Sequence, residues 1–175
     1  MRCLLDKVTA RHIVSGLVKI SEGRTPTDAE SFALDLYNRA SHSGIALFIL
    51  PQTERVLRHL ERLPHYAPLI RLFRNQTQVT FPTRYFKRWA RRLRNCGFTR
   101  EDAGVLAIGT FGTTSDGNVL GMHAVATFDQ PMINLWAAQQ MVIEQQLANM
   151  RRNLPTPYRH ALLPQVHPPE DILGL

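Results

Sequence analysis

Short apolar runs alternate along this chain with longer stretches that have helical periodicity. Three runs are the clearest: residues 1–5, residues 45–50 between Gly44 and Pro51, and residues 123–129, which end in an acid. Continuous apolar runs of this length are typical of strands buried on both faces of a parallel sheet. The pattern therefore predicts an α/β protein with a central parallel sheet.

Helical segments with start and stop signals separate these strands. We expect helices over residues 9–21, 25–42, 51–60, 66–73, 84–94, 99–108 and 132–152. Weaker strand signals lie at residues 78–81 and in the Pro-rich tail, where either 161–163 or 165–167 could add an edge strand.

Four acidic residues stand where an apolar element ends or a helix begins. Asp6 and Asp129 follow predicted strands, Glu54 lies in the first turn after Pro51, and Asp102 lies three residues after the predicted cap Thr99. In a parallel α/β sheet the carboxyl ends of the strands and the starts of the following helices share one edge, where ligands bind. The four acids therefore suggest a cation site. Each acid also has a structural explanation as a cap or a favourable charge at a helix N-terminus.

Length and cysteine content limit the number of domains and the cellular location that we expect. With 175 residues and 44% hydrophobic content, we expect one domain with one well-buried core. Cys3 and Cys96 lie far apart, and we find no signal peptide and no apolar run of membrane-spanning length. We expect a soluble protein in a reducing, cytoplasmic setting, with both cysteines structural.

Positive charge is concentrated in one predicted helix. The net charge is +7, and residues 84–94 carry six basic residues and no acid, which leaves +1 for the rest of the chain. The basic residues are Arg84, Lys87, Arg88, Arg91, Arg92 and Arg94. Apolar residues such as Trp89 and Leu93 fall on the other side of the helix and can pack on the core. The basic side is either a solvated face or a surface that contacts a phosphate backbone.

The order of elements resembles the PIN domain family, the metal-dependent nuclease fold of VapC-type toxins and of RNA-processing enzymes. The matching pieces are Leu4-Leu5-Asp6, Pro51-Gln52-Thr53-Glu54, Asp102-Ala103, Ala126-Thr127-Phe128-Asp129 and the tail at residues 167–173. The resemblance implies a three-layer α/β/α fold with a central, mostly parallel sheet of four to five strands. It also implies a single PIN-like domain over residues 1–175, closed by the extended segment 153–175.

The resemblance further implies a metal-dependent endoribonuclease that hydrolyses single-stranded RNA with Mg²⁺ or Mn²⁺. Asp6 and Asp129 would be direct ligands, Asp102 would bind directly or through water, and Glu54 would act through a bound water, with Thr127 and Thr9 in support. Hard, oxygen-ligated divalent cations can activate a water and balance the charge of the developing oxyanions. Members of this family are often toxins with an antitoxin partner, and they often form homodimers. We therefore expect a homodimer, and an antitoxin is a candidate partner whose existence the sequence does not decide.

One position departs from the family pattern. Many members carry a small polar residue two positions after the first Asp, whereas this chain has Val8, preceded by Lys7. Either Thr9 substitutes for it, or Lys7 neutralises the acids. The alternative function is therefore a catalytically inactive PIN-like module that binds RNA or protein. A third possibility is an unrelated doubly wound α/β protein in which the acids are caps. The sequence has no Gly-x-Ser-x-Gly nucleophile elbow, and we identify no His pair at zinc-ligand spacing beside a Cys or acid as a zinc site.

Overall fold

Five parallel strands form the central sheet. The computed structural model describes residues 1–40, 42–115, 117, 119 and 121–174. The sheet contains β1 (Arg2–Leu5), β2 (Ala46–Ile49), β3 (Thr77–Val79), β6 (Ala124–Ala126) and β7 (Gln165–His167), in the order β3-β2-β1-β6-β7. Every neighbouring pair in this sheet is parallel. The predicted parallel α/β sheet is therefore confirmed.

The strand order reverses beside the first strand. The chain builds outward from β1 through β2 to β3, then crosses to the other side of β1 to add β6 and β7. Cys3 pairs with Ala124 and Leu5 with Ala126 across the line where the order reverses. In open α/β sheets this topological switch point is where ligands bind, outside the carboxyl ends of the strands. The residues that follow β1 and β6 therefore stand at the position of greatest functional interest.

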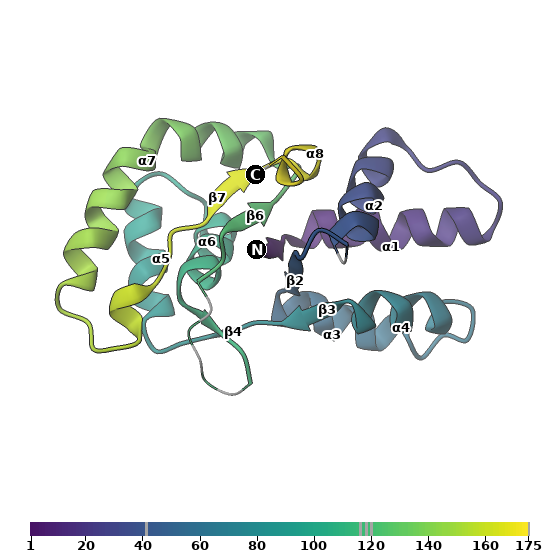
Figure 1. Cartoon of the computed structure of the whole chain (residues 1–175), viewed down its shortest axis with the longest axis horizontal. Coiled ribbons are helices and arrows are strands. Elements are labelled where there is room, and N and C mark those ends of the chain that lie inside the picture. The colour runs from purple at the N-terminus through teal and green to yellow at the C-terminus, as the bar shows by residue number, and fades with distance from the viewer. Residues whose placement is uncertain (41, 116, 118, 120, 175) are drawn as a thin grey trace.

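Helices cover both faces of the sheet, because successive strand side chains point in opposite directions. Cys3 and Leu5 pack on one side, with helices α1 (Lys7–Ser21), α2 (Asp28–Ala40), α3 (Pro51–Leu60), α4 (Ala67–Asn75) and α8 (Pro169–Ile172). Leu4 and Val125 pack on the other, with α5 (Phe86–Asn95), α6 (Arg100–Phe111) and α7 (Gln130–Arg151). Figure 1 shows α1 to α4 on the right of the strands and α5 to α7 on the left. The three-layer α/β/α architecture is confirmed.

Two smaller features complete the chain. β4 (Phe81–Pro82) and β5 (Gly112–Thr113) form a short antiparallel ribbon, so the strand expected over residues 78–81 is divided between β3 and β4. The 3₁₀ helix η1 (Tyr158–His160) precedes β7, and residues 165–167 supply the edge strand of the Pro-rich tail. None of the helices in the described ranges is long and apolar enough to cross a membrane.

Helix α6 is longer than the sequence suggests. The Gly-rich stretch predicts an end to the helix after Ile108, yet α6 continues through Gly109 to Phe111. A Cβ atom at Gly109 would lie 2.9 Å from Pro164 Cγ and 3.5 Å from Val125 Cγ2. Gly109 therefore allows close packing between α6, β6 and the tail. By contrast, Gly97 has φ +100° and follows α5, as a left-handed cap should.

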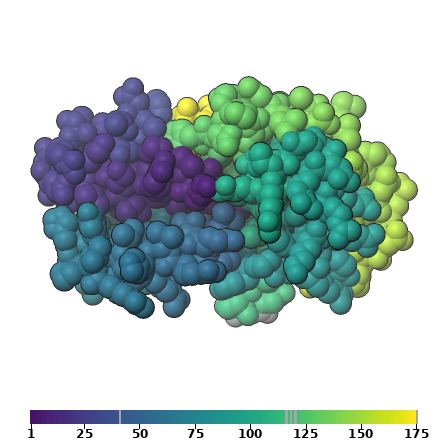
Figure 2. All heavy atoms as spheres, turned by 180° about the vertical axis from the view of Figure 1, so that it is seen from behind, coloured from purple at the N-terminus to yellow at the C-terminus, as the bar shows by residue number. Residues whose placement is uncertain are grey.

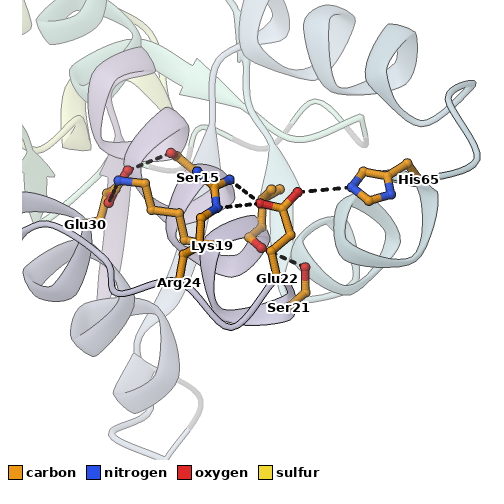
Figure 3. A network of polar contacts seen from close by, with 8 residues as sticks. Ser15, Lys19, Ser21, Glu22, Arg24, Glu30 and His65 are labelled. Atoms are coloured by element: carbon orange, nitrogen blue, oxygen red, sulfur yellow. Dashed lines mark hydrogen bonds and ion pairs between the residues drawn. The ribbon is translucent and has the colours of Figure 1, made fainter.

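A polar network joins α1 to α2. The Glu30 carboxylate, 5% exposed, accepts hydrogen bonds from Ser15 Oγ (2.6 Å), Lys19 Nζ (2.6 Å) and the backbone N–H of Thr27 (2.7 Å). Figure 3 shows Ser15 and Lys19 directed at Glu30, next to a second set in which Glu22 meets Arg24 and His65. Burial raises the pKa of Glu30, but these hydrogen bonds outweigh it and lower the pKa to about 2. Thr27 and Glu30 are spaced as a capping box, and both hydrogen bonds of that motif are present.

Candidate functional site

Asp6 is a buried carboxylate directly after β1. Its side chain is 7% exposed and caps α1, with Oδ1 accepting the backbone N–H of Thr9 at 2.6 Å. Its other oxygen, Oδ2, accepts the hydroxyl of Thr127 at 2.6 Å. Burial raises the pKa of Asp6, and the hydrogen bonds from Thr127 and Thr9 oppose this shift in part. A cation beside this carboxylate would favour its ionised form.

Thr127 connects Asp6 to Asp129 across the switch point. Its hydroxyl donates to Asp6 and accepts the backbone N–H of Asp129 at 3.1 Å, so one oxygen bridges the two acidic residues. Asp129 in turn caps α7, with Oδ1 accepting the N–H of Met132 at 3.1 Å. Thr9 supports the same edge, because its hydroxyl donates to the carbonyl oxygen of Ala126 at 3.0 Å. The structure therefore brings Asp6, Asp129 and both predicted supporting threonines together.

The start of α6 reaches the same edge of the sheet. Lys7, directly after Asp6, forms an ion pair with Glu101 in the first turn of α6. Lys7 therefore pairs outward with α6 and not with Asp6. Asp102 lies beside Glu101 and accepts the Thr99 hydroxyl through Oδ2 at 2.7 Å. Figure 2 shows the purple atoms of the first residues meeting the teal atoms of this region.

Glu54 is engaged by arginines. It is 8% exposed, and its carboxylate accepts hydrogen bonds from Arg58 Nε at 2.7 Å and from Arg74 Nη2 at 2.9 Å through Oε1. Its other oxygen, Oε2, accepts Arg74 Nε at 3.2 Å. The sequence analysis placed Glu54 in the acidic cluster, but two guanidinium groups already balance the charge of its carboxylate. The geometry gives Glu54 a role in joining α3 to α4.

The donor set suits a hard divalent cation held by two carboxylates. Asp129 Oδ2 accepts no hydrogen bond from the described residues, and the two Asp6 oxygens are held by the Thr9 N–H and the Thr127 hydroxyl. Mg²⁺ is commonly held by one or two carboxylates, with waters and substrate phosphate completing its shell. Across residues 1–40, 42–115, 117, 119 and 121–174, however, no group of three or more His, Cys, Asp or Glu side chains could hold a metal ion. Of the four predicted ligands, Asp6 and Asp129 are the two that the Thr127 hydroxyl joins.

His12 is a residue near this edge that the sequence analysis missed. Its ring meets the ring of Phe128 edge-on, with centroids 5.1 Å apart, and Phe128 stands between Thr127 and Asp129. Burial lowers the pKa of His12, and Arg11 lowers it further, while Glu30 and Asp6 act in the opposite direction. The sequence feature that could have identified His12 was its position on α1, one turn after Thr9. That feature identifies a helix face but not the strand that packs against it.

The basic helix presents its charge to solvent. Five cationic side chains are exposed: Lys87, Arg88, Arg91 and Arg94 on α5, and Arg84, which lies before the helix because α5 begins at Phe86 and not at residue 84 as expected. Arg92 is half-buried and donates to the carbonyl oxygen of Gln146 at 3.3 Å. Trp89 is fully buried and donates to Thr110 Oγ1 at 3.1 Å, so it is not available to stack on a base.

Comparison of this chain with protein-family models, with curated proteins and with solved structures found no significant match. The PIN resemblance therefore remains a prediction based on the motifs and the order of elements.

Proposed function

We propose that this chain is a PIN-like, Mg²⁺- or Mn²⁺-dependent endoribonuclease that cleaves single-stranded RNA. The observation that supports this most strongly is the pair of carboxylates that follow adjacent parallel strands, Asp6 after β1 and Asp129 after β6, joined through the Thr127 hydroxyl at the switch point. Two acids so placed give a divalent cation two anionic ligands and leave the rest of its shell to water and phosphate.

Each residue has a defined part in this proposal. Asp6 and Asp129 hold the ion, Thr127 orients both acidic residues, and Thr9 fixes the Asp6 carboxylate at the start of α1. Asp102, whose carboxylate accepts the Thr99 hydroxyl, would act through a water molecule. When bound, the ion supplies an activated water and a counter-charge for the phosphate oxygens. The exposed cations of α5 would hold the RNA backbone.

Thiol chemistry is not part of the proposal. Burial raises the pKa of Cys3 to about 12, so its thiol is a poor nucleophile. Neither cysteine forms a disulfide, which supports a reducing, cytoplasmic setting. The antitoxin partner and the homodimer rest on the family resemblance alone and stay predictions.

A second candidate function is a catalytically inactive RNA-binding module of the same fold. The pairing of Glu54 with Arg58 and Arg74 favours it, because one of the four expected acids is already neutralised by the protein. The module would keep the cationic face of α5 and use Asp6 and Asp129 only as caps.

Cleavage of a mixed-sequence single-stranded RNA separates the two candidates. The purified protein is assayed with Mn²⁺, with Mg²⁺ and with EDTA, beside Asp129→Asn, which keeps a side-chain oxygen to cap α7. Asp35→Asn, on the exposed side of α2, is the matched control. We expect metal-dependent cleavage that falls roughly 100-fold or more in Asp129→Asn, since even outer-shell partners of a metal are worth 10- to 100-fold. RNA binding at low salt without cleavage would establish the inactive module.

A further inference from the structure

A second cationic surface lies on the outer face of α3. Arg55 and His59 lie one turn apart on α3, and Arg62 lies in the turn that follows the helix. All three side chains are exposed. With Val56 and Leu60 they line an open groove of about 660 Å³. Val56 is 60% exposed and gives this groove an apolar wall.

The positive charge of this surface is not balanced within the described chain. Residues 51–75 contain five arginines and two glutamates, a net charge of +3. Both glutamates are already paired, Glu54 with Arg58 and Arg74, and Glu61 with Arg74. Among the described residues, Arg55 and Arg62 form no ion pair, and no carboxylate lines the groove. Their guanidinium groups are therefore available to an anion from outside.

We propose that the α3 groove binds the phosphate backbone of single-stranded nucleic acid, with Arg55 and Arg62 as the contacts. Guanidinium groups match phosphate oxygens through paired N–H donors, and the apolar wall suits a sugar or an unstacked base. This inference deepens the proposed function by naming a second contact for the same substrate, and it rests on that function for the choice of RNA.

An extended polyanion fits the arrangement better than a compact acidic partner does. The α3 groove belongs to the layer on one face of the sheet, and the exposed cations of α5 belong to the layer on the other. Both surfaces lack acids, and a flexible chain of phosphates could contact both. α3 also begins directly after β2, the strand beside β1, so the groove starts at the edge that carries Asp6.

Binding is tested with a fluorescein-labelled 12-nucleotide polyuridine RNA by anisotropy, in EDTA so that no cleavage occurs. The double variant Arg55→Gln, Arg62→Gln is compared with Arg39→Gln, Arg152→Gln, which removes the same charge from exposed positions on other elements. We expect Kd to rise about fivefold or more at 50 mM salt in the α3 variant only. The slope of log Kd against log salt should fall by roughly 0.7 for each phosphate that the variant no longer binds.

Two outcomes would overturn this inference, and a third would contradict only the proposed nuclease activity. Equal Kd values for the two double variants, both with the melting temperature of the parent, would exclude the groove. A polyglutamate peptide that competes as well as the RNA at equal charge would instead identify a docking surface for an acidic protein. Because the assay needs no metal, normal RNA binding together with absent cleavage would contradict the nuclease and leave the groove established.

Discussion

At the scale of single residues, the most specific prediction concerns the effect of Asp6 on the pH dependence of stability. Its pKa is raised in the folded state from the ordinary value of 3.8, so the folded protein binds this proton more tightly than the unfolded chain. The resulting stability is fully present below that ordinary value and is lost as pH rises through the folded-state pKa. At pH 7 without metal, burial of this carboxylate therefore destabilises the fold.

Asp6→Asn should consequently melt at a higher temperature than the parent at pH 7 in EDTA, with the difference shrinking as the pH approaches about 4. Asparagine keeps an oxygen for the cap of α1, so the helix is retained. Mn²⁺ should raise the melting temperature of the parent but not of the variant, because a ligand stabilises only the state that binds it. A lower melting temperature for Asp6→Asn at pH 7 in EDTA, with Asp35→Asn unchanged, would contradict this account.

Partners within one helical turn were predicted from sequence spacing, whereas several contacts between distant residues were missed. Thr99 caps α6 and Thr27 pairs with Glu30 within one turn, so sequence spacing was enough. The contact of His12 with Phe128 and the pairing of Lys7 with Glu101 join residues about a hundred positions apart. Such contacts depend on which strands become neighbours, which the apolar pattern does not specify.

At the scale of elements, the junction between α1 and α2 depends on Glu30. Its pKa is lowered to about 2, so the stability it contributes is present above the ordinary value of 4.5 and is lost as pH falls toward 2. Glu30→Gln should destabilise the protein by about 2 kcal/mol at pH 7, a figure reduced from the full shift to allow for solvent screening.

Urea unfolding of Glu30→Gln and of the parent at pH 7, 4 and 2.5 checks this prediction. The difference in the free energy of unfolding should be full at pH 7 and fall to roughly a quarter of that value at pH 2.5. Glu144→Gln, an exposed glutamate on α7, is the control and should change little. A pH-independent loss in Glu30→Gln would point to packing as the cause.

The two cationic helices show why charge counting found one surface and missed the other. α5 has no acid, so its charge is visible in the sequence. On α3 and α4 the glutamates offset part of the arginine charge in a count along the chain. In the structure, Arg58 and Arg74 form ion pairs with those glutamates. Arg55 and Arg62 form no ion pair with any described residue.

At the scale of the whole molecule, the sequence predicted the layers but not the strand order. Buried apolar runs separated by helices indicate a parallel sheet covered on both faces, as found. The crossing from β3 to the far side of β1 is what makes Asp6 and Asp129 neighbours. α7 buries Trp136 and Ile143 in the core, so it packs on the sheet, while Met141 stays 84% exposed. The predicted homodimer could use that exposed face.

We propose that Asp6 and Asp129 hold a divalent cation. Titration of the protein with Mn²⁺ measures this binding itself. Bound Mn²⁺ is counted by electron paramagnetic resonance in the parent, in Asp6→Asn, in Asp129→Asn and in Glu54→Gln. The account predicts saturable binding that both aspartate variants lose and that Glu54→Gln retains, since arginines already engage Glu54. Absence of saturable Mn²⁺ binding in the parent, or equal binding in the folded aspartate variants, would contradict it.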